Sequence, residues 1–374
     1  MNKVAAKPRR REPWRAGEIF EDDAVIRYDD KDGRSCRVHT NDMDFSKRVV
    51  QIEKVTRMVI HTRGPLFSYS PHKGQGKATP LGEKFLKVLK YDFSVVRDMF
   101  PHHTFTPLLG LFETHTDSVR HLLGVVDLSI ASDVIEVNLC IEAIRLEAKS
   151  REFMAKREKF ARAVRDNTRS LRTLVDGIYA QWSRNLVLRI DVGFRQASCY
   201  PWASKDQRIT YEQARAYRET LITYLQTDFP RTLRGYAWTM EEGFYKSYHC
   251  HLLIFVDGNE HRDHVGIVRE IGEVWRDQIT QGNGTYWNVN AHADEYIRRG
   301  VGDIHYSNVE AMNALMEYVV PYITKGGHFI RMNAGDDHTY DRSQLPKVKP
   351  IKQGRRRTSV SMLVGPAKRQ VQPS

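Results

Sequence analysis

Two short stretches of this sequence hold residue types that could carry out chemistry together. The first is His249-Cys250-His251, which opens an apolar run that continues to residue 256. In a β-strand alternate side chains share a face, so the two histidines point the same way and Cys250 points to the opposite face. Two imidazoles placed like this can bind a single cation. The first stretch therefore predicts a metal site.

The second stretch runs from Tyr318 through Tyr322 to Lys325. In a helix, side chains three or four residues apart lie on one side, so all three can face a common partner. A tyrosine hydroxyl is a weak nucleophile until it loses its proton, and a lysine one turn away favours the phenolate. A divalent cation beside such a nucleophile suits attack on a phosphodiester, because it neutralises and orients the phosphate. The two stretches together indicate phosphodiester chemistry on DNA.

A third metal ligand is expected from the strand that precedes the histidines. Glu241 and Glu242 both lie there, and the alternation of side chains does not separate them. Imidazole with carboxylate suits Mn²⁺, whereas Mg²⁺ prefers oxygen ligands but is abundant. We expect the cofactor to be Mg²⁺ or Mn²⁺.

The elements that must position these residues follow a regular order. Alternating or continuous apolar runs predict strands, 3.6-residue periodicity predicts helices, and a capping-box pattern begins at Thr210. The predicted strands are 186–194, 235–242, 248–256 and 286–289, and the predicted helices begin near 210, 263 and 308. The first six elements have the order β-α-β-β-α-β, so we predict an α+β fold with a ferredoxin-like central antiparallel sheet and both helices on one face. The continuous apolar run of 248–256 predicts that this strand is central.

The rest of the chain divides into three further regions. Residues 1–16 form a basic tail, 17–166 an N-terminal region of unknown role that is mainly helical towards its end, and 336–374 a basic C-terminal tail, leaving 167–335 as the catalytic domain. Both tails have compositions typical of disorder. In the N-terminal region we predict a loop over 65–82, a helix over about 82–99, and one long helix over 132–181 that uses its apolar residues for packing.

The charge of the chain favours an anionic partner. Lys and Arg total 58 against 46 Asp and Glu, and the sequence pI is about 9.4. The sequence has no acidic residue beyond Arg342, and the C-terminal tail contains Arg355, Arg356 and Arg357, which we expect to contact phosphates. Lys246 and Tyr248, in the turn before the third strand, have the basic and aromatic character that suits single-stranded DNA, although a plain exposed turn explains them nearly as well.

The cellular compartment is predicted from two further features. The four cysteines form no CxxC pair, which is typical of a reduced interior. No stretch approaches the roughly 18 apolar residues of a membrane span, and residues 1–14 lack the apolar core of a signal peptide. We therefore expect a cytoplasmic protein without a membrane partner, in the host cytoplasm if a phage encodes it.

These motifs resemble those of HUH endonucleases, which are named for His-hydrophobic-His and carry a catalytic tyrosine on a later helix, as in rolling-circle replication initiators. Segments 186–194 and 236–241, the histidine pair and Tyr322-Ile-Thr-Lys325 look most like the inovirus gene 2 replication-initiation family. The pairing of Tyr318 with Tyr322 also resembles the two-tyrosine initiators of isometric single-stranded DNA phages. The resemblance covers 167–335, roughly half of the chain, and departs from the pattern at Cys250 and Pro321. Cys250 is a small apolar substitute, whereas Pro321 must kink the helix or start it, which affects Tyr318 more than Tyr322.

The resemblance implies a specific reaction and a set of roles. It implies that His249, His251 and, by the family pattern, Glu241 hold the metal, while Tyr322 cleaves origin DNA and keeps the 5′ phosphate. Tyr318 would be a second nucleophile that permits alternating transfers, or a packing aromatic. The implied partners are single-stranded and origin DNA with a host single-strand binding protein. A host helicase is also implied, because the sequence has no Walker A motif.

Two other classes of function fit the same sequence. A relaxase or a transposase would use the same site and the same chemistry. A non-catalytic DNA-binding protein would use the basic tails for affinity, with the histidine pair as a structural feature. Such a protein would retain its function without His249, His251 or Tyr322, whereas an HUH enzyme would lose cleavage with any one of them.

Overall fold

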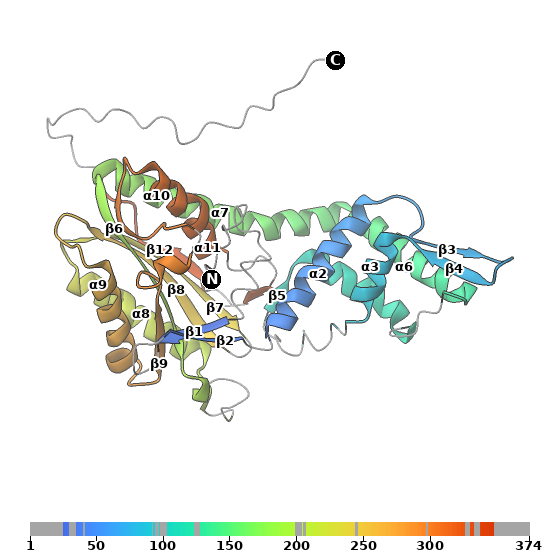
Figure 1. Cartoon of the computed structure of the whole chain (residues 1–374), viewed down its shortest axis with the longest axis horizontal. Helices are drawn as coiled ribbons and strands as arrows, with labels where there is room; N and C mark the ends of the chain where they lie inside the picture. Colours follow the sequence, from blue (N-terminus) through green and yellow to red (C-terminus); the bar gives the residue numbers. More distant parts are fainter. Residues whose placement is uncertain are drawn as a thin grey trace, which may run out of the picture.

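A computed structural model gives the fold of the chain (Figure 1). It describes residues 25–29, 35–39, 42–91, 93, 97, 103–122, 128–198, 204, 207–243, 246–296, 298–325, 330–332 and 337–347. The predicted N-terminal tail and the arginines at 355–357 lie outside these residues. The fold is α+β, and it is elongated, with an antiparallel sheet at one end and a group of helices at the other.

The main sheet has the spatial order β10-β6-β8-β7-β12, and all of its neighbouring strands are antiparallel. Strand β9 pairs with the second half of β6, along the same edge on which β10 pairs with the first half. The strands are β6 (Arg184–Phe194), β7 (Leu233–Gly243), β8 (Ser247–Asp257), β9 (Gly284–Asn288), β10 (Gly302–His305) and β12 (Tyr340–Arg342). All four predicted strands are present, and β8 is central as its apolar run predicted.

Two helices cover one face of this sheet, α8 (Tyr211–Asp228) and α9 (His264–Glu273). Their apolar stripes pack on the side chains of β6 and β8 that share this face, including Leu188, Ile190 and Leu252. The predicted capping box begins α8: the Gln213 N–H donates to Thr210 Oγ1 at 3.3 Å, and the Gln213 side chain accepts from the Thr210 N–H at 3.0 Å. Helix α9 continues as a π-helical segment over Val274–Ile279.

The opposite face is covered by α7 (Arg151–Gln181) and by the helix that carries the two tyrosines. That helix runs as α10 (Val309–Ala314), a π-helical segment (Leu315–Val319) and α11 (Val320–Ile323). The expected perturbation by Pro321 takes this form, because proline lacks an N–H and its ring crowds the carbonyl four residues earlier. A π-helical turn before it relieves both conflicts.

The N-terminal helices surround a second hydrophobic core. They are α2 (Asp42–His61), α3 (Pro80–Leu89), α5 (Pro107–Thr116) and α6 (Ala131–Ala148). Three further pairs of strands are present: β3 (Phe67–Ser70) with β4 (Gln75–Ala78) in this part, β5 (His103–Phe105) with β11 (Ile330–Met332), and β1 (Val25–Asp29) with β2 (Ser35–His39). The β1–β2 pair lies beside the main sheet, where β1 contacts β9 (Figure 1). Short 3-10 helices lie at Asp117–Leu122, Gln196–Ser198 and Ala293–Glu295.

Two predictions for the N-terminal region were wrong. Residues 65–82 are not a loop, since β3 and β4 form a hairpin there, with Phe67 buried and Gly74 at a φ of 54° in the turn. The predicted helix over 132–181 is two helices, because the Ser150 hydroxyl accepts from the Phe153 N–H at 3.1 Å and starts a new helix, α7. Several apolar residues predicted to pack are exposed on α6, namely Ile135, Leu139 and Leu146.

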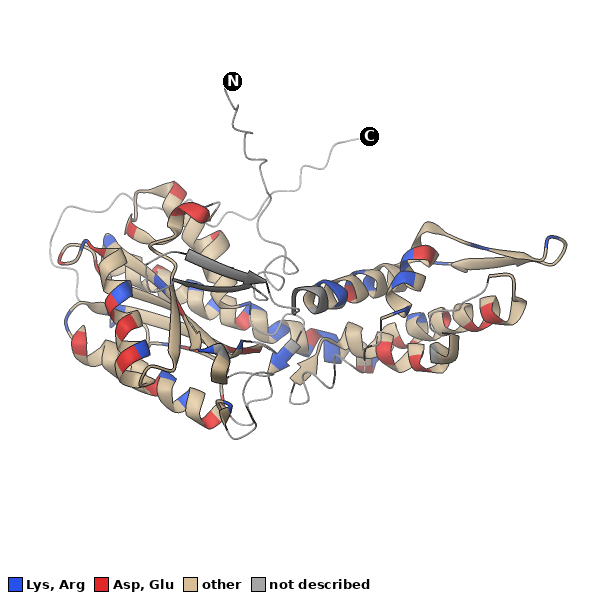
Figure 2. Ribbon diagram, turned by 60° about the horizontal axis from the view of Figure 1, so that its bottom comes forward, with Lys and Arg blue, Asp and Glu red and all other residues tan. Residues whose placement is uncertain are grey.

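Helix α7 joins the two cores and runs through the predicted boundary at residue 166. Phe153 belongs to the N-terminal core, whereas Leu171, Leu174 and Ile178 belong to the core beneath the sheet. Basic residues and fewer acidic ones are interspersed along it (Figure 2). At the other end of the chain, β12 lies inside the range assigned to the C-terminal tail, so ordered structure continues there and pairs with β7.

Candidate metal centre

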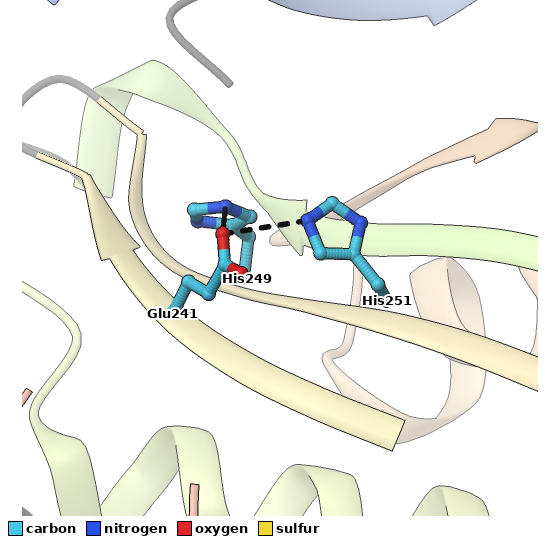
Figure 3. Close-up of side chains that lie close together, drawn as sticks. All are labelled: Glu241, His249 and His251. Atoms are coloured by element: carbon cyan, nitrogen blue, oxygen red, sulfur yellow. Dashed lines mark ion pairs between the residues drawn. The ribbon is translucent and has the colours of Figure 1, made fainter. Parts of the chain in front are cut away.

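The antiparallel pairing of β7 and β8 brings three potential ligands to one face of the sheet. Glu241 lies directly opposite His249, and His251 is two residues further along the same face. The Oε2 atom of Glu241 is 3.5 Å from His249 Nε2 and 3.6 Å from His251 Nε2 (Figure 3). One ligand atom from each of the three residues lies within 4.8 Å of the others. The arrangement could therefore hold one metal ion.

The same register separates the two candidate carboxylates. Glu242 is paired with Tyr248, so its side chain belongs to the other face of the sheet. There its Oε2 is 3.7 Å from Nε2 of His103, a residue of β5. The geometry therefore brings Glu241 to the histidines.

The donor set fits a metal ion on its own chemistry. Ligand atoms about 2.0–2.2 Å from a common ion lie roughly 3.0–3.6 Å apart, which the two distances from Glu241 match. Among the described residues, Glu241 Oε1 and His249 Nε2 are buried without a hydrogen-bond partner. Buried polar atoms are normally satisfied, so these two atoms are available to a bound ion.

Asp191, which the sequence analysis did not single out, orients His251 from the other side. It lies opposite His251 in the pairing of β6 with β8, and its Oδ1 is 2.8 Å from His251 Nδ1. A carboxylate on one ring nitrogen fixes the tautomer and leaves the other nitrogen, Nε2, directed to the metal position. His249 has an equivalent contact, since its Nδ1 is 3.2 Å from the Ser247 carbonyl oxygen.

Electrostatics in the metal centre are dominated by burial and by neighbouring charges. Burial alone would raise the pKa of Glu241, but the two histidines outweigh it and lower that pKa to about 2. Burial alone would lower the pKa of His251, but Asp191 and Glu241 raise it to about 9. Burial, together with Lys246, lowers the pKa of His249. The carboxylate is therefore ionised and available to a cation at neutral pH.

Tyr322 lies directly beside the candidate metal ligands. Its ring centroid is 5.2 Å from that of His251, and the side chain is 5% exposed. The Thr239 hydroxyl donates to the Ile323 carbonyl at 2.5 Å, which ties α11 to β7 at this point. Lys325 Nζ is 3.9 Å from the Tyr322 ring centroid and 3.8 Å from Glu241 Oε2. The structure thus brings the tyrosine and the lysine to the predicted ligands.

Arg189 is a second residue that sequence reasoning missed. Its guanidinium carbon is 3.7 Å from the Tyr322 ring centroid, and its Nη2 is 3.1 Å from Asp191 Oδ2. Burial alone would lower its pKa, but Asp191, Tyr322 and Tyr296 raise it. The only local signal was a charged residue inside an apolar strand, which by itself does not identify a site.

The remaining predicted residues are less close to the ligands. Tyr318 is half-buried in the π-helical segment, where it shares a pocket with Tyr322. Lys246 is half-buried in the turn before β8 and acts electrostatically on His249. Tyr248 belongs to the other face of the sheet, with its ring centroid 5.9 Å from that of Tyr211.

Comparisons with known proteins give no relative. A scan against protein-family models found no matching family, a search of curated proteins found no match, and a search of solved structures found none. Within the ranges that the structure describes, we find no helix that is both long and apolar enough to cross a lipid bilayer.

Proposed function

We propose that this protein is an HUH endonuclease of the rolling-circle initiator type, which nicks and rejoins single-stranded origin DNA. One support is the topology: in chain order the strands β6, β7, β8 and β9 have the spatial order β9-β6-β8-β7, with α8 and α9 on one face. This order supports the predicted ferredoxin-like arrangement. The histidines lie on a central strand of it, as the resemblance implies.

The observation that carries the proposal is the contact between Tyr322 and His251. A tyrosine from a helix late in the chain lies against the cluster of Glu241, His249 and His251, of which His251 is buried and the other two are half-buried. Tyrosines in cores are common, but this one also has two cations at its ring, Arg189 at 3.7 Å and Lys325 at 3.9 Å. A metal-binding cluster and a tyrosine between cations are the parts that transesterification requires.

In the proposed reaction the Tyr322 oxygen attacks phosphorus in the DNA strand. The phosphorus–oxygen bond to tyrosine forms as the bond to the 3′ oxygen breaks, which leaves a 5′-phosphotyrosyl strand and a 3′ hydroxyl. The phenolic proton is lost, and the 3′ oxygen takes up a proton. The reverse reaction by a 3′ hydroxyl rejoins the strand without ATP, because the phosphodiester energy is kept in the tyrosyl bond.

Each nearby side chain has a role in this proposal. Lys325 and Arg189 stabilise the negative charge that develops on the tyrosine oxygen. Asp191 holds His251 so that Nε2 faces the ligand position. A divalent ion held by Glu241, His249 and His251, either Mg²⁺ or Mn²⁺, would neutralise and orient the phosphate. The partners in this proposal are single-stranded origin DNA, a host helicase and a host single-strand binding protein, in the host cytoplasm.

The test is covalent capture of DNA. Labelled single-stranded DNA from the surrounding replicon is incubated with Mn²⁺ and the wild type, Tyr322→Phe, Tyr318→Phe or His251→Ala, and then resolved on a denaturing gel. Tyr217→Phe is the matched control, since Tyr217 packs beside Phe194 and Trp275 on the other face of the sheet.

We expect a protein-linked band that requires metal, persists in Tyr217→Phe and disappears in Tyr322→Phe and His251→Ala. Loss of a polar or ionic partner can unfold a protein, so each variant is first checked by circular dichroism. Folded wild type that forms no adduct with any metal or replicon strand would refute the proposal and favour a DNA-binding protein. A relaxase or transposase would give the same adduct, but on a transfer-origin or transposon-end strand.

A further inference from the structure

An open pocket adjoins Tyr322 on the side formed by the turns after β9. Six of the residues that line it carry aromatic or cationic side chains: Arg189, Tyr296, Arg298, Arg299, Tyr318 and Tyr322. None of the three metal ligands lines this pocket, although Tyr322 contacts His251. The pocket is therefore a separate feature that shares its tyrosine with the metal centre.

Arg189 forms the buried part of the pocket. The residue is 4% exposed, and its one carboxylate contact is Nη2 to Asp191 Oδ2 at 3.1 Å within the described part of the chain. Its Nε is buried without a hydrogen-bond partner among the same residues. A guanidinium has five N–H donors and no acceptor, so the group that satisfies this nitrogen must be an acceptor. An anion supplies such an acceptor and forms a charge-assisted hydrogen bond with it.

The rim of the pocket is cationic as well. Arg298 Nη1 is 3.4 Å from Glu310, and Arg299 pairs with Asp294, but the two carboxylate side chains are 82% and 78% exposed. Exposed ion pairs contribute little, so either arginine can exchange its carboxylate for a ligand at small cost. Tyr296 is fixed instead, because its hydroxyl accepts from Trp287 Nε1 at 3.3 Å.

The charge of the pocket indicates which ligand group it can hold. The pocket is open to solvent and has a volume of about 30 Å³. A single water needs roughly 10–15 Å³ on this measure, so a group of a few heavy atoms fits. The planar guanidinium fork of arginine matches the oxygens of a phosphate. The cationic side chains therefore favour a phosphate group.

We propose that this pocket binds one phosphate of the single-stranded DNA, with Arg189 at its base and Arg298 and Arg299 at its rim. The identity of the ligand as DNA rests on the proposed function. A phosphate held there fixes the path of the strand across Tyr318 and Tyr322, so that a neighbouring phosphodiester meets the Tyr322 oxygen at the metal centre. Arg189 is thus a positioning residue for the strand as well as a neighbour of the nucleophile.

The test locates a single phosphate without any cleavage. Full-length Tyr322→Phe protein, in EDTA, is titrated with fluorescent replicon strands that each carry one neutral methylphosphonate, and binding is followed by anisotropy. We expect one position at which the methylphosphonate weakens binding about tenfold or more, because a charge-assisted contact is lost. With Arg298→Gln and Arg299→Gln added, the effect of the same methylphosphonate should be much smaller, since only Arg189 remains to contact the phosphate.

The control removes a charge elsewhere on the surface. Arg169→Gln lies on α7, where the arginine is 76% exposed and pairs with Asp166, and it should keep the full methylphosphonate effect. Arg189→Lys retains the buried charge but not the fork, and it should reduce the effect at that position alone. The salt slope of binding should fall by about 0.7 for each phosphate contact removed from a single strand.

The pocket proposal fails if the parent shows no sensitive position, or if the rim variants keep the full effect of the methylphosphonate. Its failure is distinct from failure of the proposed function. If the wild type forms an adduct at Tyr322 but no phosphate position is sensitive, the pocket proposal alone is refuted. If one phosphate position is sensitive and the sensitivity requires Arg298 and Arg299, but the protein never forms an adduct, the pocket proposal stands and the nuclease proposal is refuted.

Discussion

Asp191 and His251 face each other across the paired strands β6 and β8, with Asp191 Oδ1 2.8 Å from His251 Nδ1. The second oxygen of the same carboxylate is 3.1 Å from Arg189 Nη2. One half-buried carboxylate therefore joins a candidate metal ligand to the guanidinium that lies against Tyr322. The metal centre and the candidate nucleophile are held by a common support.

Asp191→Asn should weaken metal binding without removing a ligand. The amide keeps the size of the carboxylate but loses the charge that orients His251, and such supporting contacts typically change metal affinity by about 10–100-fold. Mn²⁺ affinity can be measured from the electron paramagnetic resonance of the free ion. Asp166→Asn, on the exposed face of α7, is the control. Equal Mn²⁺ affinity in Asp191→Asn and wild type would show that Asp191 does not support the site.

Metal should stabilise the folded protein only when Glu241 is intact. A ligand at about 100 times its dissociation constant adds roughly 2.7 kcal/mol to the free energy of unfolding. We expect Mn²⁺ to raise the midpoint of thermal unfolding of the wild type by several degrees relative to EDTA, and that of Glu241→Gln by far less. Glu242→Gln, one residue away on the opposite face, should respond like the wild type. Equal responses of the two variants would place the ion elsewhere.

Tyr318→Phe should retain the first cleavage and lose later strand transfer. Tyr322 contacts His251, whereas Tyr318 lies in the π-helical segment and lines the pocket shared with Tyr322. We therefore expect adduct yield on a single-site strand within about threefold of wild type. On a strand with two sites, release of the joined product should fall at least tenfold. Full joining by the variant would make Tyr318 a packing aromatic.

Stability at acid pH should depend on Asp257. Burial alone would raise its pKa, but the Asn259 N–H and the Arg234 guanidinium hold that pKa below its usual value of 3.8. A depressed pKa contributes stability that is complete above pH 3.8 and is lost as pH falls through the lower folded value. The Arg234 side chain is 4% exposed and also donates to the Arg184 carbonyl and to Asn185. Its guanidinium therefore stays buried when Asp257 loses its charge.

Asp257→Asn should therefore cost about 1–3 kcal/mol at neutral pH, because Arg234 stays buried with a weaker partner. The loss should shrink in urea unfolding experiments as pH approaches and passes below 3.8. Asp228→Asn, at the exposed end of α8, should change stability by less than about 0.5 kcal/mol. A deficit in Asp257→Asn that does not change with pH would indicate lost packing instead of lost charge.

A deletion that tests the N-terminal region must leave helix α7 whole. The predicted boundary at residue 166 would cut this helix and remove its N-terminal turns, although Leu171, Leu174 and Ile178 pack under the sheet. The sequence indicated the helix but not its division, since Ser150 starts α7 by a hydrogen bond that amphipathic periodicity does not register.

The sequence by itself determined what depends on neighbours along the chain. Alternation placed His249 and His251 on one face of a strand, and the Thr210 capping box started α8. The first feature follows from the 2.0-residue period of a strand and the second from a hydrogen-bond pattern within one turn, so a few residues are enough to display both. The prediction that Lys325 lies on the tyrosine helix was wrong, because α11 ends at Ile323, although Lys325 Nζ still lies 3.9 Å from the Tyr322 ring centroid.

The tertiary structure decided what depends on register and on packing between distant segments. A shift of one residue between β7 and β8 would have brought Glu242 to the histidines in place of Glu241, and nothing within either strand sets that pairing. Asp191 and Arg189 joined the site because β6 lies beside β8 and α11 packs over both. These contacts link residues more than fifty positions apart, and their register is fixed by the burial of whole sheet faces.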